Sequence, residues 1–137
     1  MEQKHEEPRW KLRFQSFQQS LIDFKQALQQ PEYSVLERAG LIQLFEVSFE
    51  LSWKVLKDYL EFLGHQAKSP RETIRTAFEF GIIEDVDAWL DALETRNTFT
   101  HTYGGDMITV SEQKIKKESA PLLLTLEKYL IAVQDDT

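Results

Sequence analysis

The stretch from Ser34 to Gly64 constrains the fold more than any other part of this chain. Residues 34–37 (S-V-L-E) have the S-x-x-E pattern of a capping box, in which the serine and the glutamate bond backbone N–H groups at the start of a helix. Gly64 is typical of the position after a helix, because glycine readily adopts the left-handed conformation that ends many helices. The sequence therefore predicts one long helix between these two residues.

This predicted helix has too many apolar residues for a single apolar face. The apolar residues are Leu41, Ile42, Leu44, Phe45, Val47, Phe49, Leu51, Trp53, Val55, Leu56, Tyr59, Leu60 and Leu63. The polar residues form only a narrow strip: Gln43, Glu46, Glu50, Lys54, Lys57 and Glu61. A helix that is apolar on most sides lies at the centre of a bundle or in a subunit interface.

The remaining helices follow from the positions of glycine, proline and capping residues. The five glycines and four prolines fall between periodic segments, as expected for helices joined by short connections. Apolar residues at steps of three and four predict a first helix that follows a flexible tail, residues 1–8, and ends near Pro31. Residues 69–72 (S-P-R-E) predict a second capping box and a short helix that ends at Gly81.

Two further helices are predicted in the second half of the chain. Acidic residues at 84, 85 and 87 favour a helix N-terminus, where carboxylates interact well with the helix dipole. Ser111 is predicted to cap the last helix, and Pro121 either kinks this helix or splits it in two. The fold is thus predicted to be all-α: one domain, residues 9–134, built as a five-helix antiparallel (up-and-down) bundle.

Composition excludes several classes of function. The chain has no cysteine and only three scattered histidines, so no disulfide, cysteine nucleophile or metal site is expected. A net charge of −7 argues against a general nucleic-acid coat protein and against a DNA partner, although a local RNA site is compatible with it. The charged first seven residues and the lack of a long apolar run predict a cytoplasmic protein with no membrane partner.

A group of polar residues lies at the end of the fourth predicted helix. The apolar face that ends at Leu93 continues with Asn97 and His101, which are four residues apart and share a surface. Arg96 lies beside Asn97, and Tyr103 follows Arg96 by seven residues, so the four side chains form two adjacent polar columns. One interpretation is structural, because Arg and His near a helix C-terminus interact favourably with the dipole. The other is a catalytic site.

Several segments of the chain resemble the HEPN superfamily. Residues 96–101 (R-N-T-F-T-H) match its R-x4-H signature, and Tyr103 extends it to the R-x4-H-x-Y version of toxins paired with minimal nucleotidyltransferases. Residues 44–54 (LFEVSFELSWK) resemble the F-E-x-x-F-E-L-x-W-K stretch of this subfamily, and residues 69–72 resemble its S-P-R-E helix start. The resemblance extends from about residue 14 to residue 129. The subfamily is labelled nucleotidyltransferase substrate-binding protein.

The resemblance implies a homodimer in which a two-fold axis brings two R-x4-H motifs to one cleft. It also implies RNA cleavage without a metal or another cofactor. His101 would transfer protons, a role suited to the near-neutral pKa of histidine. Arg96 would hold the phosphate and the charge that grows on its oxygens, and Asn97 would orient the phosphate or His101. A nucleotidyltransferase encoded nearby would silence the site by transferring AMP to Tyr103.

Two other functions remain open at this level. The protein could be a non-enzymatic accessory subunit whose dimer cleft binds a nucleotide or another substrate of the transferase. Glu46, Glu50 and Lys54 would then be candidate cleft residues, although a solvated strip with an ordinary Glu50–Lys54 pair is the simpler interpretation. The third alternative is a purely structural helical module, in which the motif residues have no chemical role.

Overall fold

The computed structural model describes residues 7–101 and 111–136, with the side chains of residues 100 and 101 excepted. Within these ranges the chain forms helices and connections and no strand. The helices are α1 (Arg9–Leu28), α2 (Val35–Phe62), α3 (Pro70–Glu79) and α4 (Val86–His101). A last helix spans residues 111–134 and includes the π-helical turn η1 (Ile115–Ser119) and α6 (Ala120–Gln134). Counted as one element, it completes the five predicted helices.

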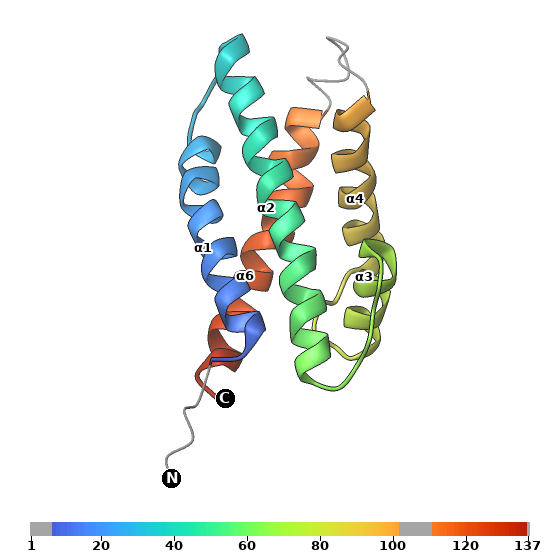
Figure 1. The fold of residues 1–137 in the computed structure, drawn as a ribbon. Helices are drawn as coiled ribbons and strands as arrows, with labels where there is room; N and C mark the ends of the chain where they lie inside the picture. The colour runs from blue at the N-terminus through green and yellow to red at the C-terminus, as the bar shows by residue number, and fades with distance from the viewer. Residues whose placement is uncertain (1–6, 102–110, 137) are drawn as a thin grey trace.

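The long helices run alternately up and down, with α2 in the middle (Figure 1). Helices α1 and α4 lie on either side of α2, α6 lies behind it, and α3 lies beside the first turns of α4 (Figure 1). Helix α2 contacts α1, α3, α4 and α6. The predicted all-α antiparallel bundle and the central position of the long helix are therefore confirmed.

The bundle itself buries most of the apolar surface of α2. Among its fully buried side chains are Leu41, Phe45, Phe49, Val55, Leu56 and Leu60. In the middle of the helix only Val47 is exposed among the apolar residues, at 41%, and the other exposed ones lie at its ends. The apolar excess of this helix is thus explained by its place in the monomer, and it gives little separate support to a subunit interface.

Local signals define both ends of α2. Ser34 Oγ accepts from the Glu37 N–H at 3.1 Å, and the Glu37 carboxylate accepts from the Ser34 N–H at 2.9 Å, so the predicted capping box is complete. At the other end Gly64 has φ 93°, and the Gly64 and His65 N–H groups bond to Glu61 and Leu60 carbonyls. This is the Schellman arrangement, and it confirms the predicted end of the helix.

The second predicted capping box is only half correct. Ser69 Oγ accepts from the Glu72 N–H at 3.1 Å, as predicted, and Pro70 begins α3. The Glu72 carboxylate, however, accepts from the N–H of Lys68, one residue before the predicted donor. Helix α4 is capped by a carboxylate as expected, because Asp85 Oδ1 accepts from the Ala88 N–H at 3.0 Å.

The last helix passes through Pro121 without splitting. Proline has no N–H, and its ring clashes with the carbonyl four residues earlier, so the helix must adjust on its N-terminal side. The adjustment is the π-helical turn just before it, in which the Ala120 N–H bonds to the Ile115 carbonyl. Ser111, the predicted cap of this helix, is itself helical, and the residues before it lie outside the described part of the chain, so its capping role stays a prediction.

We expect Ser34→Ala to lower the free energy of unfolding by about 1 kcal/mol, because it removes the side-chain acceptor of the capping box. Urea denaturation monitored by circular dichroism measures this change. The matched control is Ser16→Ala, which replaces an exposed serine inside α1 and should cost nothing measurable. Equal effects of the two substitutions would contradict the capping role.

Tyr59 makes stability depend on pH in the alkaline range. Its side chain is buried, and its ring lies edge-on to Trp10 (5.0 Å between centroids) and Tyr129 (6.3 Å). Burial, followed by the neighbouring Tyr129, raises the pKa of Tyr59 from 10.0 to about 12.

The unfolded chain therefore releases this proton near pH 10, whereas the folded chain keeps it until near pH 12. We expect stability to fall as the pH rises between these values, and Tyr59→Phe to lose less stability over the same interval than the parent protein. Urea unfolding at pH 9 and pH 11 tests this comparison. Identical losses in the two proteins would show that Tyr59 is not the group responsible.

Candidate functional site

Helix α4 points Arg96 toward α2. Among the described side chains of α4, the buried ones are Trp89, Ala92, Leu93, Thr95 and Phe99, so its core face continues past Leu93. The sequence had suggested that this face turns polar at Asn97, but Asn97 is exposed. The reason is that the core positions of α4 advance in steps of three as well as four, which brings position 96, and not position 97, to the edge of the core. The side chain of Arg96 is accordingly only 29% exposed.

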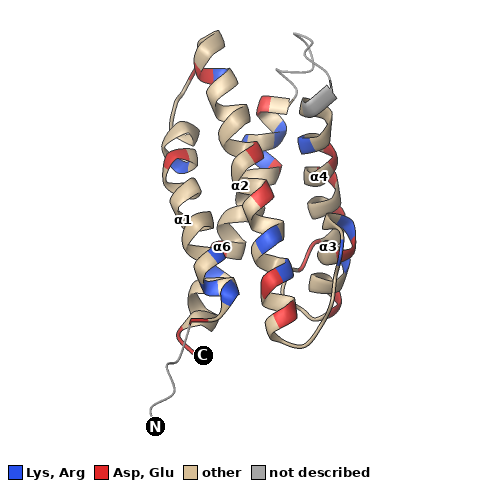
Figure 2. Ribbon diagram, in the orientation of Figure 1, with Lys and Arg blue, Asp and Glu red and all other residues tan. Residues whose placement is uncertain are grey.

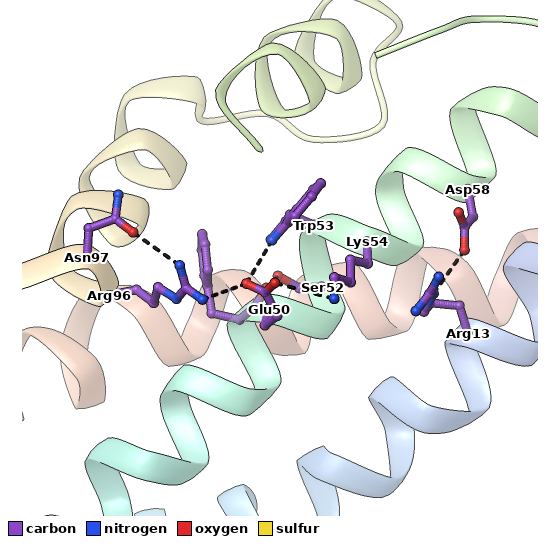
Figure 3. Close-up of polar contacts among 9 residues, drawn as sticks. Arg13, Glu50, Ser52, Trp53, Lys54, Asp58, Arg96 and Asn97 are labelled. Carbon is purple, nitrogen blue, oxygen red and sulfur yellow. Dashed lines mark hydrogen bonds and ion pairs between the residues drawn. The ribbon is translucent and has the colours of Figure 1, made fainter. Parts of the chain in front are cut away.

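An ion pair joins Arg96 to α2. Arg96 Nη2 donates to Glu50 Oε2 at 2.8 Å, and Arg96 Nη1 donates to Asn97 Oδ1 at 3.2 Å (Figure 3). Glu50 is 30% exposed, so neither charge is deeply buried. The guanidinium group is thus held from two sides, by a carboxylate on α2 and by an amide on its own helix.

Glu50 accepts from two further donors on α2. The Trp53 indole N–H donates to Glu50 Oε2 at 3.0 Å, and Lys54 Nζ lies 3.4 Å from Glu50 Oε1 (Figure 3). The ordinary Glu50–Lys54 pair is therefore present, but Glu50 is also part of the contact with the motif arginine. Burial raises the pKa of Glu46, while the positive charge of Arg96 acts in the opposite direction, so Glu46 also senses this site.

Trp53 is the site residue that sequence reasoning missed. The sequence assigns it to the apolar part of the long helix and to a family pattern, and predicts no role for it in the site. Its three-residue spacing from Glu50 places the two side chains on neighbouring positions of one helix face, and this was the available signal.

Of the other two motif residues, the structure describes the backbone of His101 and no part of Tyr103. His101 is the last residue of α4, and nothing of its side chain lies among the described parts. Tyr103 lies outside the described residues. Among the predicted site residues, the structure therefore brings together Arg96, Asn97, Glu50 and Lys54, with Glu46 nearby. The relation of this group to His101 and Tyr103 stays a prediction.

Comparison with known families identifies the chain. Residues 12–131 match the family model described as "Nucleotidyltransferase substrate binding protein like". The chain belongs to this family. The matched range includes α2, α4 and every predicted site residue, and it agrees with the subfamily that the sequence motifs resemble.

Individual relatives carry related descriptions. The protein of Haemophilus influenzae named "Probable ribonuclease HepT" is 36% identical over 70 residues. That match covers 47% of this chain and 48% of the relative, so the chain spans about half the length of the curated relative that it matches.

Two solved structures share the fold. A protein of Thermus thermophilus superposes with a TM-score of 0.72 at 28% identity, over 85% of this chain and 96% of the other. The protein HI0074 of Haemophilus influenzae, described as having the fold of a substrate binding domain of a nucleotidyltransferase, gives a TM-score of 0.56 at 28% identity, with the same coverage.

The candidate site is compact and nearly neutral in charge. Glu46, Glu50 and Lys54 of α2 lie beside Arg96 of α4, so two acidic and two basic side chains meet at the seam between these helices. Acidic and basic positions, red and blue in Figure 2, are mixed along the helices. In residues 7–101 and 111–136 no three His, Asp or Glu side chains are grouped as metal ligands would be, and no helix there is long and apolar enough to cross a bilayer.

Proposed function

We propose that this protein is a metal-independent endoribonuclease that uses the R-x4-H motif, paired with a nearby-encoded minimal nucleotidyltransferase in the cytoplasm. One observation carries the proposal: Arg96, the first residue of the motif, is held partly exposed at the α2–α4 seam by Glu50 and Asn97. An arginine with a fixed guanidinium group suits recognition of a phosphate oxygen pair. The resemblance to a relative named as a probable ribonuclease adds support.

The proposed chemistry divides the work between two residues. His101 takes a proton from the 2′-hydroxyl or gives one to the leaving 5′-oxygen, while Arg96 stabilises the charge that develops on the phosphate. Arg96 and His101 lie about 140° apart around one ideal helix. We therefore propose that a two-fold dimer forms the complete site, with motif residues from both subunits at one cleft.

RNA cleavage in EDTA tests the enzymatic part of the proposal. The purified protein, shown by intact mass to be unmodified, is expected to cleave single-stranded RNA with EDTA present and to leave single-stranded DNA of the same sequence intact. Cleavage needs the 2′-hydroxyl in this mechanism, so equal cleavage of both substrates would contradict it. No cleavage of RNA by the unmodified protein would overturn the enzymatic assignment.

Silencing by the partner has its own test. Incubation with the nucleotidyltransferase and ATP is expected to transfer an adenylyl group from ATP to the Tyr103 hydroxyl of the parent protein, with pyrophosphate as the leaving group. This adds the mass of AMP less one water and stops RNA cleavage. Tyr103→Phe is expected to gain no mass and to keep its activity under the same conditions. A full mass shift in Tyr103→Phe would place the modification on another residue.

One observation argues against RNA binding by Arg96 and is the reason that the accessory-subunit alternative is retained: the Glu50 carboxylate occupies the guanidinium group that an RNA phosphate would use. A hollow of about 420 Å³ lined by Trp89, Leu122 and Tyr129 has a size suited to a small ligand, but Glu84 and Asp85, which also line it, disfavour a nucleotide phosphate. Calorimetry with ATP and AMP separates the two functions. Tight binding by a protein that does not cleave RNA would support the accessory function.

A further inference from the structure

We infer that Glu50 is a positioning residue for Arg96. It holds the guanidinium group in the orientation that the transition state needs, and its negative charge lowers the affinity of the site for RNA. This inference deepens the proposed ribonuclease function and rests on it. Glu50 lies on α2, whereas Arg96 and the rest of the R-x4-H motif lie on α4, so the contact joins the motif to a second helix. The observations that carry it are the donors around the Glu50 carboxylate and the balance of charges at the seam.

The carboxylate of Glu50 is fixed before it meets Arg96. Its Oε2 atom accepts the Trp53 indole N–H at 3.0 Å, and its Oε1 atom lies 3.4 Å from Lys54 Nζ. Trp53 is a partly buried residue packed against the core, so its N–H is a rigid donor. These two donors, one on each carboxylate oxygen, leave the carboxylate little freedom to rotate.

A fixed carboxylate in turn fixes the guanidinium group. Ordering the long side chain of arginine costs conformational entropy. A hydrogen bond that already holds this side chain in the free protein removes part of that cost from the reaction. Glu50 holds Nη2 at 2.8 Å, and Asn97 holds Nη1 at 3.2 Å. Because the guanidinium group is planar, two contacts on different nitrogens define its plane as well as its position.

The same contact reduces the attraction of the site for a phosphate. Glu46 and Glu50 place two carboxylates beside the positive charges of Arg96 and Lys54. A carboxylate within hydrogen-bond distance of Arg96 opposes an incoming anion through the same Coulomb interaction that orients the arginine. Removal of its charge should therefore strengthen RNA binding while it weakens the alignment on which turnover depends.

Glu50→Gln separates these two effects, because glutamine keeps the shape and one acceptor but has no charge. We expect its kcat for RNA cleavage to fall about tenfold or more, as misplaced catalytic groups cause. We expect its Kd for a 2′-O-methyl RNA oligonucleotide, which lacks the attacking hydroxyl, to fall about threefold at low salt. A purely structural role would lower stability and would not combine slower turnover (a lower kcat) with tighter binding (a lower Kd).

The matched control is Glu61→Gln on the same helix. Glu61 pairs with Lys57 at 2.9 Å, so this substitution removes the same charge from α2 without touching Arg96. We expect its kcat to stay at the parent value. Trp53→Phe is a second variant in which the charge is kept and only the indole N–H on Glu50 is removed; its kcat should fall while its Kd for the 2′-O-methyl RNA stays unchanged.

The results distinguish the inference from the function on which it rests. If the parent protein cleaves RNA and both Glu50→Gln and Trp53→Phe keep its kcat, the positioning inference alone is overturned. If the parent protein does not cleave RNA at all, the proposed function fails first. A kcat loss in Glu61→Gln as large as in Glu50→Gln would also overturn the inference, because it would trace the effect to the charge of α2 as a whole.

Discussion

His101→Ala is expected to lower the rate of RNA cleavage by about 10²–10⁴-fold, the usual contribution of a positioned general acid or base. Alanine cannot exchange a proton with the 2′-hydroxyl or with the leaving oxygen. The affinity for 2′-O-methyl RNA should change little, because phosphate binding is assigned to Arg96. Single-turnover cleavage with excess enzyme measures the chemical step directly.

His65→Ala is the control for this substitution. His65 follows the end of α2, and its ring stacks on Phe80 with 3.8 Å between centroids. Loss of this histidine should leave cleavage at the parent rate. If His101→Ala also cleaves at the parent rate, the R-x4-H motif is not the catalytic centre, and the accessory-subunit function becomes the better explanation of the polar α4 terminus.

Phe45→Ala is expected to lower the free energy of unfolding by about 3–5 kcal/mol, the range for removal of a buried phenyl ring. Phe45 has no exposed surface, and it lies where three helices meet. Its ring contacts Phe24 of α1, Phe49 of α2 and Phe99 of α4, with centroid distances of 6.4, 5.9 and 6.3 Å. A cavity at this point therefore loosens α4 as well as α2. Urea denaturation at fixed pH provides the measurement.

Val47→Ala is the matched control, two residues along the same helix. Val47 is 41% exposed, so its truncation should cost less than about 1 kcal/mol. A loss below about 1 kcal/mol for Phe45→Ala would mean that the neighbouring rings close the cavity, and the junction of α1, α2 and α4 would then be less tightly packed than the ring distances indicate.

The sequence predicted well the features that depend on neighbours in the chain. Ser34 and Gly64 mark the ends of α2 because capping and the left-handed glycine act over three to five residues. The central position of α2 was predictable because its apolar residues occupy most of its circumference. The capping-box pattern does not select between neighbouring backbone donors. The predicted donor to the Glu72 carboxylate was the Ser69 N–H, and the observed one is the Lys68 N–H.

The site was predictable by residue and not by arrangement. Arg96 and Asn97 were found from their positions on one helix, and Glu50 and Lys54 from their positions on another. The sequence of either helix alone was equally compatible with charged residues that face solvent and contact no other helix. The exact core face of α4 was also misjudged at Asn97, because steps of three and four differ little over a few turns and only the packing partner selects between them.

By itself, the sequence determined that this protein is an all-α bundle with a long central helix, and it identified the R-x4-H motif at Arg96. These conclusions rest on short-range geometry, which a linear pattern records. Only the tertiary structure decided that Arg96 meets Glu50, 46 residues away, at 2.8 Å. The physical reason is that this contact depends on how α4 packs against α2, and packing is set by the shapes of many side chains together.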